Sequence, residues 1–126
     1  MESSSHKVVL VIDDEAGILE VLQSCFSELG YKVYTASGID ETIFALNQEL
    51  PDVVFLDIVL PRVDGLDILR LLKKFKKDIV VVMMSGYATE EKAKFALEQG
   101  AFDYINKPFM LEQVRNMMAM LDKSLL

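Results

Sequence analysis

Short runs of apolar residues alternate along this chain with longer segments in which apolar residues recur every three or four positions. Compact apolar runs rich in Val and Ile are typical of strands buried on both faces, whereas the longer spacing is typical of amphipathic helices. The alternation predicts five strands, each followed by a helix. The predicted strands are Lys7–Ile12, Tyr31–Ala36, Asp52–Asp57, Ile79–Met84 and Phe102–Asn106.

The predicted helices are delimited by residues that commonly end helices. Gly30 follows the first helical segment, Pro51 lies beyond the second, and Gly100 ends the fourth. The third segment runs from about Gly65 to Phe75 and the fourth from about Thr89 to Gln99. The apolar positions that mark the helices are Ile18, Leu19, Leu22, Phe26 and Leu29; Ile43, Phe44 and Leu46; Leu66, Leu69, Leu72 and Phe75; Ala93, Ala96 and Leu97; and, from near Met110 onward, Leu111, Val114, Met118, Leu121 and Leu125.

This order of elements predicts the fold class. Strands this apolar cannot face water, so the alternation favours an α/β fold with one parallel sheet covered by helices on both faces. The 126 residues are enough for one compact domain and too few for two ordinary ones. No linker or repeat divides the chain, so one domain is predicted over residues 7–126. The Ser-rich residues 1–6, which include His6, are predicted to be a disordered tail.

Charge and composition narrow the classes of partner. The formal net charge of -7 disfavours broad electrostatic binding to nucleic acid or to an anionic membrane. No apolar run reaches the roughly 20 residues of a membrane span, and the start of the chain lacks the apolar core of a signal peptide. A cytoplasmic protein is therefore predicted. The single cysteine, Cys25, cannot form an internal disulfide and is interpreted as a small core residue.

Chemically active residues follow four of the five predicted strands. In open α/β sheets, ligands bind beyond the carboxyl ends of the strands, near the point where the strand order reverses. The residues that reach this edge are Asp13, Asp14 and Glu15 after the first strand, Asp57 after the third, Ser85 and Gly86 after the fourth, and Lys107 and Pro108 after the fifth.

Each of these residues also has an ordinary structural interpretation. Asp13 or Asp14 could cap the next helix, and Asp57 could begin a turn. Ser85 could belong to a loop, and Lys107 could be a solvated charge. Together these interpretations weaken, because several carboxylates at one edge repel one another unless a cation is bound.

A bound cation and a phosphoryl group would explain this combination. Hard oxygen ligands suit Mg²⁺, which often shares the phosphate oxygens of a substrate. A carboxylate at the tip of a strand can act as a nucleophile toward phosphorus. The added phosphoryl oxygens then need a metal ion, an ammonium group and a hydroxyl donor. Asp57, Lys107 and Ser85 fit the roles of nucleophile, ammonium group and hydroxyl donor.

Four motifs extend this interpretation to a family. They are VIDDE, FLDIVLPRVDG, MMSGYA and GAFDYINKPF, in this order and at this spacing from about Lys7 to the end of the chain. In these motifs the sequence closely resembles the receiver domain of two-component response regulators. The resemblance implies a flavodoxin-like fold with a five-stranded parallel sheet in the order 2-1-3-4-5.

The resemblance also implies a role for each residue at the sheet edge. Asp57 would accept a phosphoryl group from a sensor histidine kinase or a histidine phosphotransfer protein, in a reaction that needs Mg²⁺, with Mn²⁺ as an alternative. Ser85 would form a hydrogen bond to the phosphoryl oxygens, and Lys107 would pair with them. The peptide bond between Lys107 and Pro108 would be cis, which positions the lysine. The implied metal ligands are Asp14, Asp57 and the backbone carbonyl of Val59, with Asp13 acting mainly through water.

The resemblance further implies how the signal leaves the site. Tyr104 occupies the position of an aromatic switch that turns inward, and partners would read the face formed by the fourth helix, the fifth strand and the fifth helix. Val59 and Tyr87 occupy positions that tune dephosphorylation; both are bulky and neither is acidic, so slow loss of the phosphoryl group is expected. Phe95 and Met120 are interpreted as exposed apolar residues of the output face, suited to a partner or a homodimer.

Alternatives come from three other classes. A haloacid-dehalogenase-type phosphatase would place its nucleophile near the first strand in an Asp-x-Asp pattern, whereas Asp13 and Asp14 are adjacent. A flavodoxin would have a hydroxyl- and glycine-rich loop where this chain has acids. The serious competitor is a receiver-like module that binds a protein independently of phosphorylation. The sequence leaves open whether the domain acts alone or belongs to a longer regulator.

Overall fold

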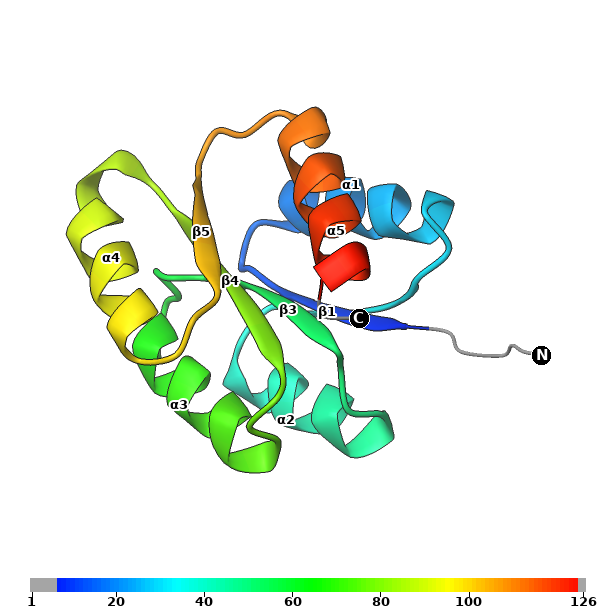
Figure 1. Ribbon diagram of the computed structural model, residues 1–126. Helices are drawn as coiled ribbons and strands as arrows, with labels where there is room; N and C mark the ends of the chain where they lie inside the picture. Colours follow the sequence, from blue (N-terminus) through cyan, green and yellow to red (C-terminus); the bar gives the residue numbers. More distant parts are fainter. Residues whose placement is uncertain (1–6, 125–126) are drawn as a thin grey trace.

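The computed structural model describes residues 7–124, except for the side chains of Tyr87 and Ser124. Its helices are α1 (Ala16–Glu28), α2 (Ile39–Gln48), α3 (Gly65–Phe75), α4 (Glu90–Glu98) and α5 (Leu111–Ser124), and a single 3₁₀ turn, Tyr87–Thr89, precedes α4. Its strands, which alternate with the helices in Figure 1, are β1 (Val8–Ile12), β2 (Lys32–Ala36), β3 (Val53–Asp57), β4 (Val80–Ser85) and β5 (Asp103–Asn106). The predicted tail, residues 1–6, and Leu125 lie outside the described residues.

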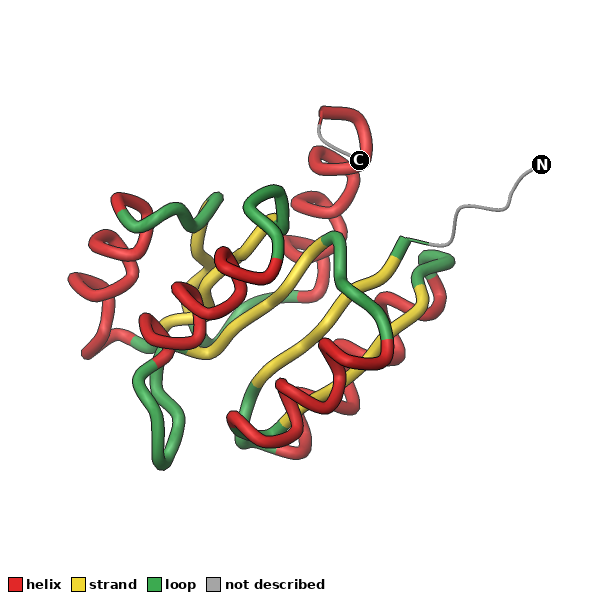
Figure 2. Tube along the Cα trace, turned by 90° about the horizontal axis from the view of Figure 1, so that it is seen from below, coloured by secondary structure: helices red, strands yellow, loops and turns green. Residues whose placement is uncertain are grey.

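The five strands form one parallel sheet in the order β2-β1-β3-β4-β5. β1 lies between β2 and β3, so that Ile12 pairs with Ala36 on one side and with Leu56 on the other. Figure 2 shows the strands as one continuous twisted layer. The predicted α/β fold and strand order are confirmed. The order reverses between β1 and β3, so residues that follow these two strands meet at one edge.

Helices cover both faces of the sheet. Figure 1 shows α1 and α5 on one side and α2, α3 and α4 on the other. Side chains that alternate along β3 supply both cores: Val54 and Leu56 pack with residues of α2, α3 and α4, whereas Val53 and Phe55 pack with residues of α1 and α5. The central strands are buried on both faces for this reason, which explains their continuous apolar runs. Cys25 is buried in the second core, as predicted.

Three apolar residues that were predicted to lie on core-facing stripes are exposed instead. Leu29 and Phe75 are 44% and 42% exposed and lie at the C-terminal ends of α1 and α3. Leu97 is 39% exposed because α4 buries a narrow stripe, consisting of Ala93 and Ala96.

The second helix has a more polar buried face than its apolar residues suggested. Its buried residues are Thr42, Ala45 and Leu46, whereas Ile43 and Phe44 are exposed. Gly30 ends α1 with a positive φ of 95°, in agreement with its predicted role. Among the described residues, no helix combines the length and hydropathy needed to cross a bilayer.

Candidate functional site

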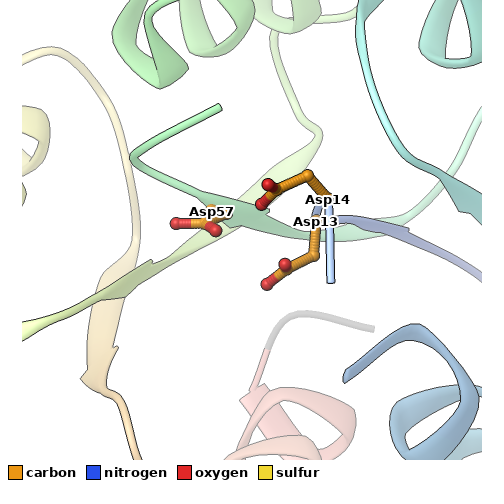
Figure 3. Close-up of side chains that lie close together, drawn as sticks. All are labelled: Asp13, Asp14 and Asp57. Carbon is orange, nitrogen blue, oxygen red and sulfur yellow. The ribbon is translucent and has the colours of Figure 1, made fainter. Parts of the chain in front are cut away.

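Three carboxylates converge at the carboxyl edge of the sheet. Asp13 and Asp14 follow β1, and Asp57 is the last residue of the neighbouring strand β3. One carboxylate oxygen from each lies within 4.8 Å of the others. Figure 3 shows the side chains of Asp13 and Asp14 diverging from the end of β1, with the Asp57 side chain beside them at the end of β3. The predicted convergence of acids is therefore present.

The backbone holds two of these carboxylates in place. Asp13 is fully buried, and its Oδ1 accepts a hydrogen bond from the amide of Glu15 at 2.8 Å. Asp57 is 6% exposed, and its Oδ1 accepts a hydrogen bond from the amide of Val59 at 3.0 Å. Asp57 thus does begin a turn, but this bond occupies one oxygen and also fixes the orientation of the carboxylate. Asp14 is exposed to solvent.

Lys107 is the central cation of the site. It follows β5, and its Nζ lies 2.6 Å from Asp13 Oδ2, 3.0 Å from Asp57 Oδ2 and 3.0 Å from Glu15 Oε1. The peptide bond from Lys107 to Pro108 is cis, as expected. Burial alone would lower the pKa of Lys107, but hydrogen bonds to the three carboxylates outweigh burial and raise the pKa above its ordinary value. Lys107 therefore remains a point charge at neutral pH.

The site still holds more negative than positive charge. One ammonium group faces the carboxylates of Asp13, Asp57 and Glu15, and Asp14 lies beside them. Burial raises the pKa of Asp13, and the nearby charge of Asp57 adds to this rise despite the hydrogen bonds from Lys107 and the Glu15 amide. A second cation would relieve this excess. The donor set of oxygen atoms alone suits a hard divalent ion such as Mg²⁺.

The hydroxyl of Ser85 lies at the end of β4, where it is fully buried. Its Oγ lies 3.0 Å from the carbonyl oxygen of Gly86 and 2.9 Å from the hydroxyl of Thr89, and it can donate to either. Among the described residues, none of its hydrogen bonds goes to Asp57. Sequence reasoning predicted Ser85 as a site residue but missed Thr89; the only available signal was a second hydroxyl residue four positions later in SGYAT.

An open cleft of about 520 Å³ lies over these groups. It gives a small ligand access to Asp57 and Lys107 from solvent. The residues that line it are Asp14, Glu15, Asp57, Val59, Leu60, Pro61, Gly86, Ala88, Thr89 and Lys107.

The loop after β3 folds tightly back on the Asp57 backbone. Val59 and Asp64 pair across this loop, and the amide of Gly65 donates to the carbonyl of Ile58 at 3.1 Å. A Cβ atom on Gly65 would lie 2.6 Å from the Asp57 carbonyl oxygen and 2.8 Å from Ile58 Cα, closer than packed atoms allow. Only glycine fits at this position without moving Asp57.

The remaining predicted residues lie outside this cluster. Tyr104 is half-buried on β5 and packs against the core on the α4 side. Phe95 on α4 and Met120 on α5 are 42% and 44% exposed, and β5 runs between their helices in Figure 1. Their exposure agrees with the sequence interpretation. The Val59 side chain is 55% exposed beside the cleft, whereas the side chain of Tyr87 lies outside what the structure describes.

Comparison with protein families assigns most of this chain to one of them. A family model described as the response regulator receiver domain matches residues 9–119. Among solved structures, the receiver domain of NtrX from Brucella abortus is 36% identical, with a TM-score of 0.85, over 92% of this chain and 98% of that one. A CheY-like receiver domain protein from Methanospirillum hungatei is 29% identical, with a TM-score of 0.84, over 94% of this chain and 96% of that one.

Curated relatives are longer than this chain. The probable transcriptional regulator ycf27 of Guillardia theta is 40% identical over 109 residues, which cover 86% of this chain and 42% of the relative. The alkaline phosphatase synthesis transcriptional regulatory protein PhoP of Bacillus subtilis is 36% identical over 109 residues, which cover 86% of this chain and 45% of the relative. The chain therefore spans less than half the length of these relatives.

Proposed function

Because this chain belongs to the response regulator receiver domain family, we propose that Asp57 accepts a phosphoryl group from a sensor histidine kinase or a histidine phosphotransfer protein. One observation carries the proposal. The Asp57 carboxylate lies in the cleft with one oxygen fixed by the Val59 amide and the other 3.0 Å from the Lys107 ammonium group. A carboxylate held in this way can present an oxygen to phosphorus while a cation waits beside it.

The transfer is a substitution at phosphorus. An oxygen of Asp57 forms a bond to phosphorus, and the bond between phosphorus and the donor nitrogen breaks. The donor imidazole keeps the electron pair of that bond and takes up a proton. Lys107 then pairs with a phosphoryl oxygen, because its ammonium group already lies at the carboxylate that becomes phosphorylated. Acetyl phosphate would react in the same way, with an acetate oxygen as the leaving group.

A divalent cation fits beside the acceptor. We assign the ligands to Asp14, Asp57 and the Val59 backbone carbonyl, with Asp13 acting mainly through water; Mg²⁺ is the natural ion and Mn²⁺ an alternative. The excess of negative charge and the raised pKa of Asp13 support this assignment. The ion would supply positive charge that offsets the charge of the transferring group.

The signal would then travel through Ser85. Phosphorylation adds about -1.5 to -2 charge and three acceptor oxygens, toward which the Ser85 hydroxyl is drawn. Tyr104 follows by turning inward, and the face formed by α4, β5 and α5, including Phe95 and Met120, changes its binding to a partner or to a second copy. Two relatives are named as transcriptional regulators, so an output of that kind is the natural expectation.

Loss of the phosphoryl group should be slow. The attacking water would have to pass Val59, whose exposed side chain lines the cleft and offers no polar atom to orient it. Tyr87 is assigned to the same role from its position in the sequence. Slow loss suits a lasting signal better than a rapid switch.

Intact-mass measurement tests this function directly. After incubation with Mg²⁺ and acetyl phosphate, the protein should gain the mass of one phosphoryl group, and the Asp57→Asn variant should gain none. Equal labelling of both proteins would remove Asp57 from the mechanism. An unlabelled parent protein that still binds its partner would favour the competing interpretation, a protein-binding module that acts without phosphorylation.

A further inference from the structure

Two hydroxyl groups and one carbonyl form a closed set of contacts at the start of α4. Ser85 Oγ lies 2.9 Å from Thr89 Oγ1, and each hydroxyl also lies within hydrogen-bonding distance of the Gly86 carbonyl oxygen, at 3.0 Å for Ser85 and 3.2 Å for Thr89. Ser85 is fully buried and Thr89 is half-buried at the rim of the cleft. Water therefore competes weakly for the Ser85 hydroxyl, and neighbouring protein groups set the orientation of this hydroxyl.

The possible proton positions in this set show which hydrogen bonds Ser85 must break before it can donate to another group. A hydroxyl carries one proton, and a carbonyl carries none. If Thr89 donates to Ser85, then Ser85 donates to Gly86. If Thr89 donates to Gly86, then Ser85 donates either to Thr89 or to the same carbonyl, which has two lone pairs. In every arrangement the Ser85 proton is donated within the set, and among the described residues none of its hydrogen bonds goes to Asp57. Ser85 can donate to a phosphoryl group on Asp57 only after it leaves these partners.

Thr89 is also placed where a helix cap would be expected. It is the N-cap residue of α4, a position at which a threonine hydroxyl commonly accepts a hydrogen bond from an amide in the first turn. Its side chain makes no such bond here. The hydroxyl contacts Ser85 and Gly86 instead. The N-cap residue of α4, Thr89, is thus in contact with the Ser85 hydroxyl.

We infer that Thr89 is a positioning residue that holds the Ser85 hydroxyl in its resting orientation and must release it when Asp57 is phosphorylated. The inference rests on the proposed function. The hydrogen bond between the two hydroxyls stabilises the resting state and is absent from the phosphorylated state, where Ser85 turns to the phosphoryl oxygens. Its loss also frees the start of α4, which links the chemistry at Asp57 to the output face.

The affinity for beryllofluoride, a mimic of the phosphoryl group, tests this role. Thr89→Val keeps the shape of the side chain and removes the hydroxyl, so the variant should bind beryllofluoride with Mg²⁺ about fivefold more tightly than the parent, the equivalent of one net hydrogen bond. Thr89→Ser keeps the hydroxyl and should match the parent within about twofold. Dissociation constants from NMR titration give both values. Thr89→Ala, which also lacks the hydroxyl, serves as the second variant if valine disturbs folding.

A double-mutant cycle separates positioning from a general effect on the helix. In a Ser85→Ala background, replacing Thr89 by Val should change the affinity by less than about twofold, because the partner of the hydroxyl is already gone. A gain of the same size in both backgrounds would overturn the inference. Weaker or unchanged binding by Thr89→Val in the parent background would overturn it as well, since Thr89 would then support the phosphorylated state or neither state.

The resting population gives an independent measurement. Without beryllofluoride, amide resonances of residues 86–92 in Thr89→Val should shift from their parent positions toward those of the bound protein, because a resting state that loses a bond is less populated. Unshifted resonances would contradict the inference. A parent protein that neither binds beryllofluoride nor becomes labelled would instead overturn the proposed function, so the two failures are distinguishable.

Discussion

The two edges of the sheet carry similar residues and use them differently. At the edge formed by the amino ends of the strands, Asp52 Oδ2 accepts a hydrogen bond from the Val8 amide at 2.9 Å. At the same edge, Lys73 Nζ donates to the Ile79 carbonyl at 2.7 Å. Both of these charged side chains have a backbone partner. At the opposite edge, Lys107 contacts three side-chain carboxylates, and these acids outnumber it.

The difference shows how charge can serve either stability or chemistry. A charged side chain that forms a hydrogen bond to the backbone joins two segments of the fold, and the backbone group takes up its bonding capacity. Carboxylates that outnumber the ammonium group they face leave an excess of negative charge, which a metal ion can offset. The four predictions below compare matched residues at the two edges, starting with the largest expected effect.

The two half-buried lysines, Lys107 and Lys73, should differ most. Lys107→Ala should lower the rate of Asp57 labelling by acetyl phosphate about 100-fold, because it removes a charged donor from the transferring group. Lys73→Ala should label at the parent rate but lose about 1 kcal/mol of the free energy of unfolding, because its hydrogen bonds to the Lys77 and Ile79 carbonyls disappear. Labelling kinetics and urea unfolding give the two quantities. A slow Lys73→Ala variant would remove the contrast between the edges.

Magnesium should stabilise the protein by binding at the carboxyl edge of the sheet, and residues of the amino edge should not affect this. At a concentration about ten times its dissociation constant, Mg²⁺ should raise the free energy of unfolding of the parent by about 1.4 kcal/mol, since it binds the folded state. Asp14→Ala should abolish this gain, because Asp14 is proposed as a ligand of the ion and its exposed side chain belongs to the acidic cluster. Asp78→Ala, which removes an exposed acid beside Lys73 at the other edge, should retain it. Thermal unfolding with Mg²⁺ and with a chelator is the measurement.

Neutralising Asp13 should stabilise the metal-free protein. Burial raises the pKa of Asp13 in the folded state, so the folded protein takes up this proton at a higher pH than the unfolded chain does. The charged form therefore lowers stability above the folded pKa. The loss shrinks as pH falls below that pKa and is gone below the pKa of the unfolded chain. In chelator at neutral pH, Asp13→Asn should therefore be more stable than the parent.

The pH dependence and a matched variant check this interpretation. The advantage of Asp13→Asn over the parent should shrink as pH is lowered through the folded pKa, in urea-unfolding series at several pH values. Asp52→Ala at the opposite edge should lose stability instead, because it removes the acceptor of the Val8 amide. An Asp13→Asn variant that is less stable than the parent at neutral pH would show that Lys107 compensates the buried charge completely.

The smallest effect is expected at Glu15. Its carboxylate is mostly exposed and competes with Asp57 for Lys107, so Glu15→Gln should speed labelling by no more than about threefold, as for other exposed ion pairs. Glu28→Gln, at the far end of α1, should leave the rate unchanged. The acceleration should disappear at high salt, which already screens the exposed pair. Slower labelling would indicate that Glu15 helps to orient Lys107.

Much of this molecule was predictable because periodicity and strand order are local properties. Runs of Val and Ile predicted the strands, and the carboxyl ends of parallel strands share one edge. The sequence alone therefore placed Asp13, Asp14, Asp57, Ser85 and Lys107 together. The exposure of Leu97 and Phe75 was not predictable in this way. It depends on how each helix is rotated on the sheet and how far it extends beyond it.

Two partners at the site also escaped prediction, for geometric reasons. The contact between Ser85 and Thr89 requires the turn between them to bring two hydroxyls within 2.9 Å. The contact between Glu15 and Lys107 joins residues far apart in the chain through two flexible side chains. Neither type of contact has a sequence period. The output role of Phe95, Tyr104 and Met120 stays a prediction, since exposure alone does not identify a partner.

Gly65 sets a condition on how such a site can be inherited or engineered. Because a side chain at Gly65 would collide with the backbone of Asp57 and Ile58, Asp57 and Gly65 must be retained together. A designer who grafts Asp57 alone onto the strand end of another α/β protein would transfer the carboxylate without the space that sets its direction. The smallest portable version of this acceptor is therefore the whole segment from Asp57 to Gly65, a loop and the first residue of a helix together.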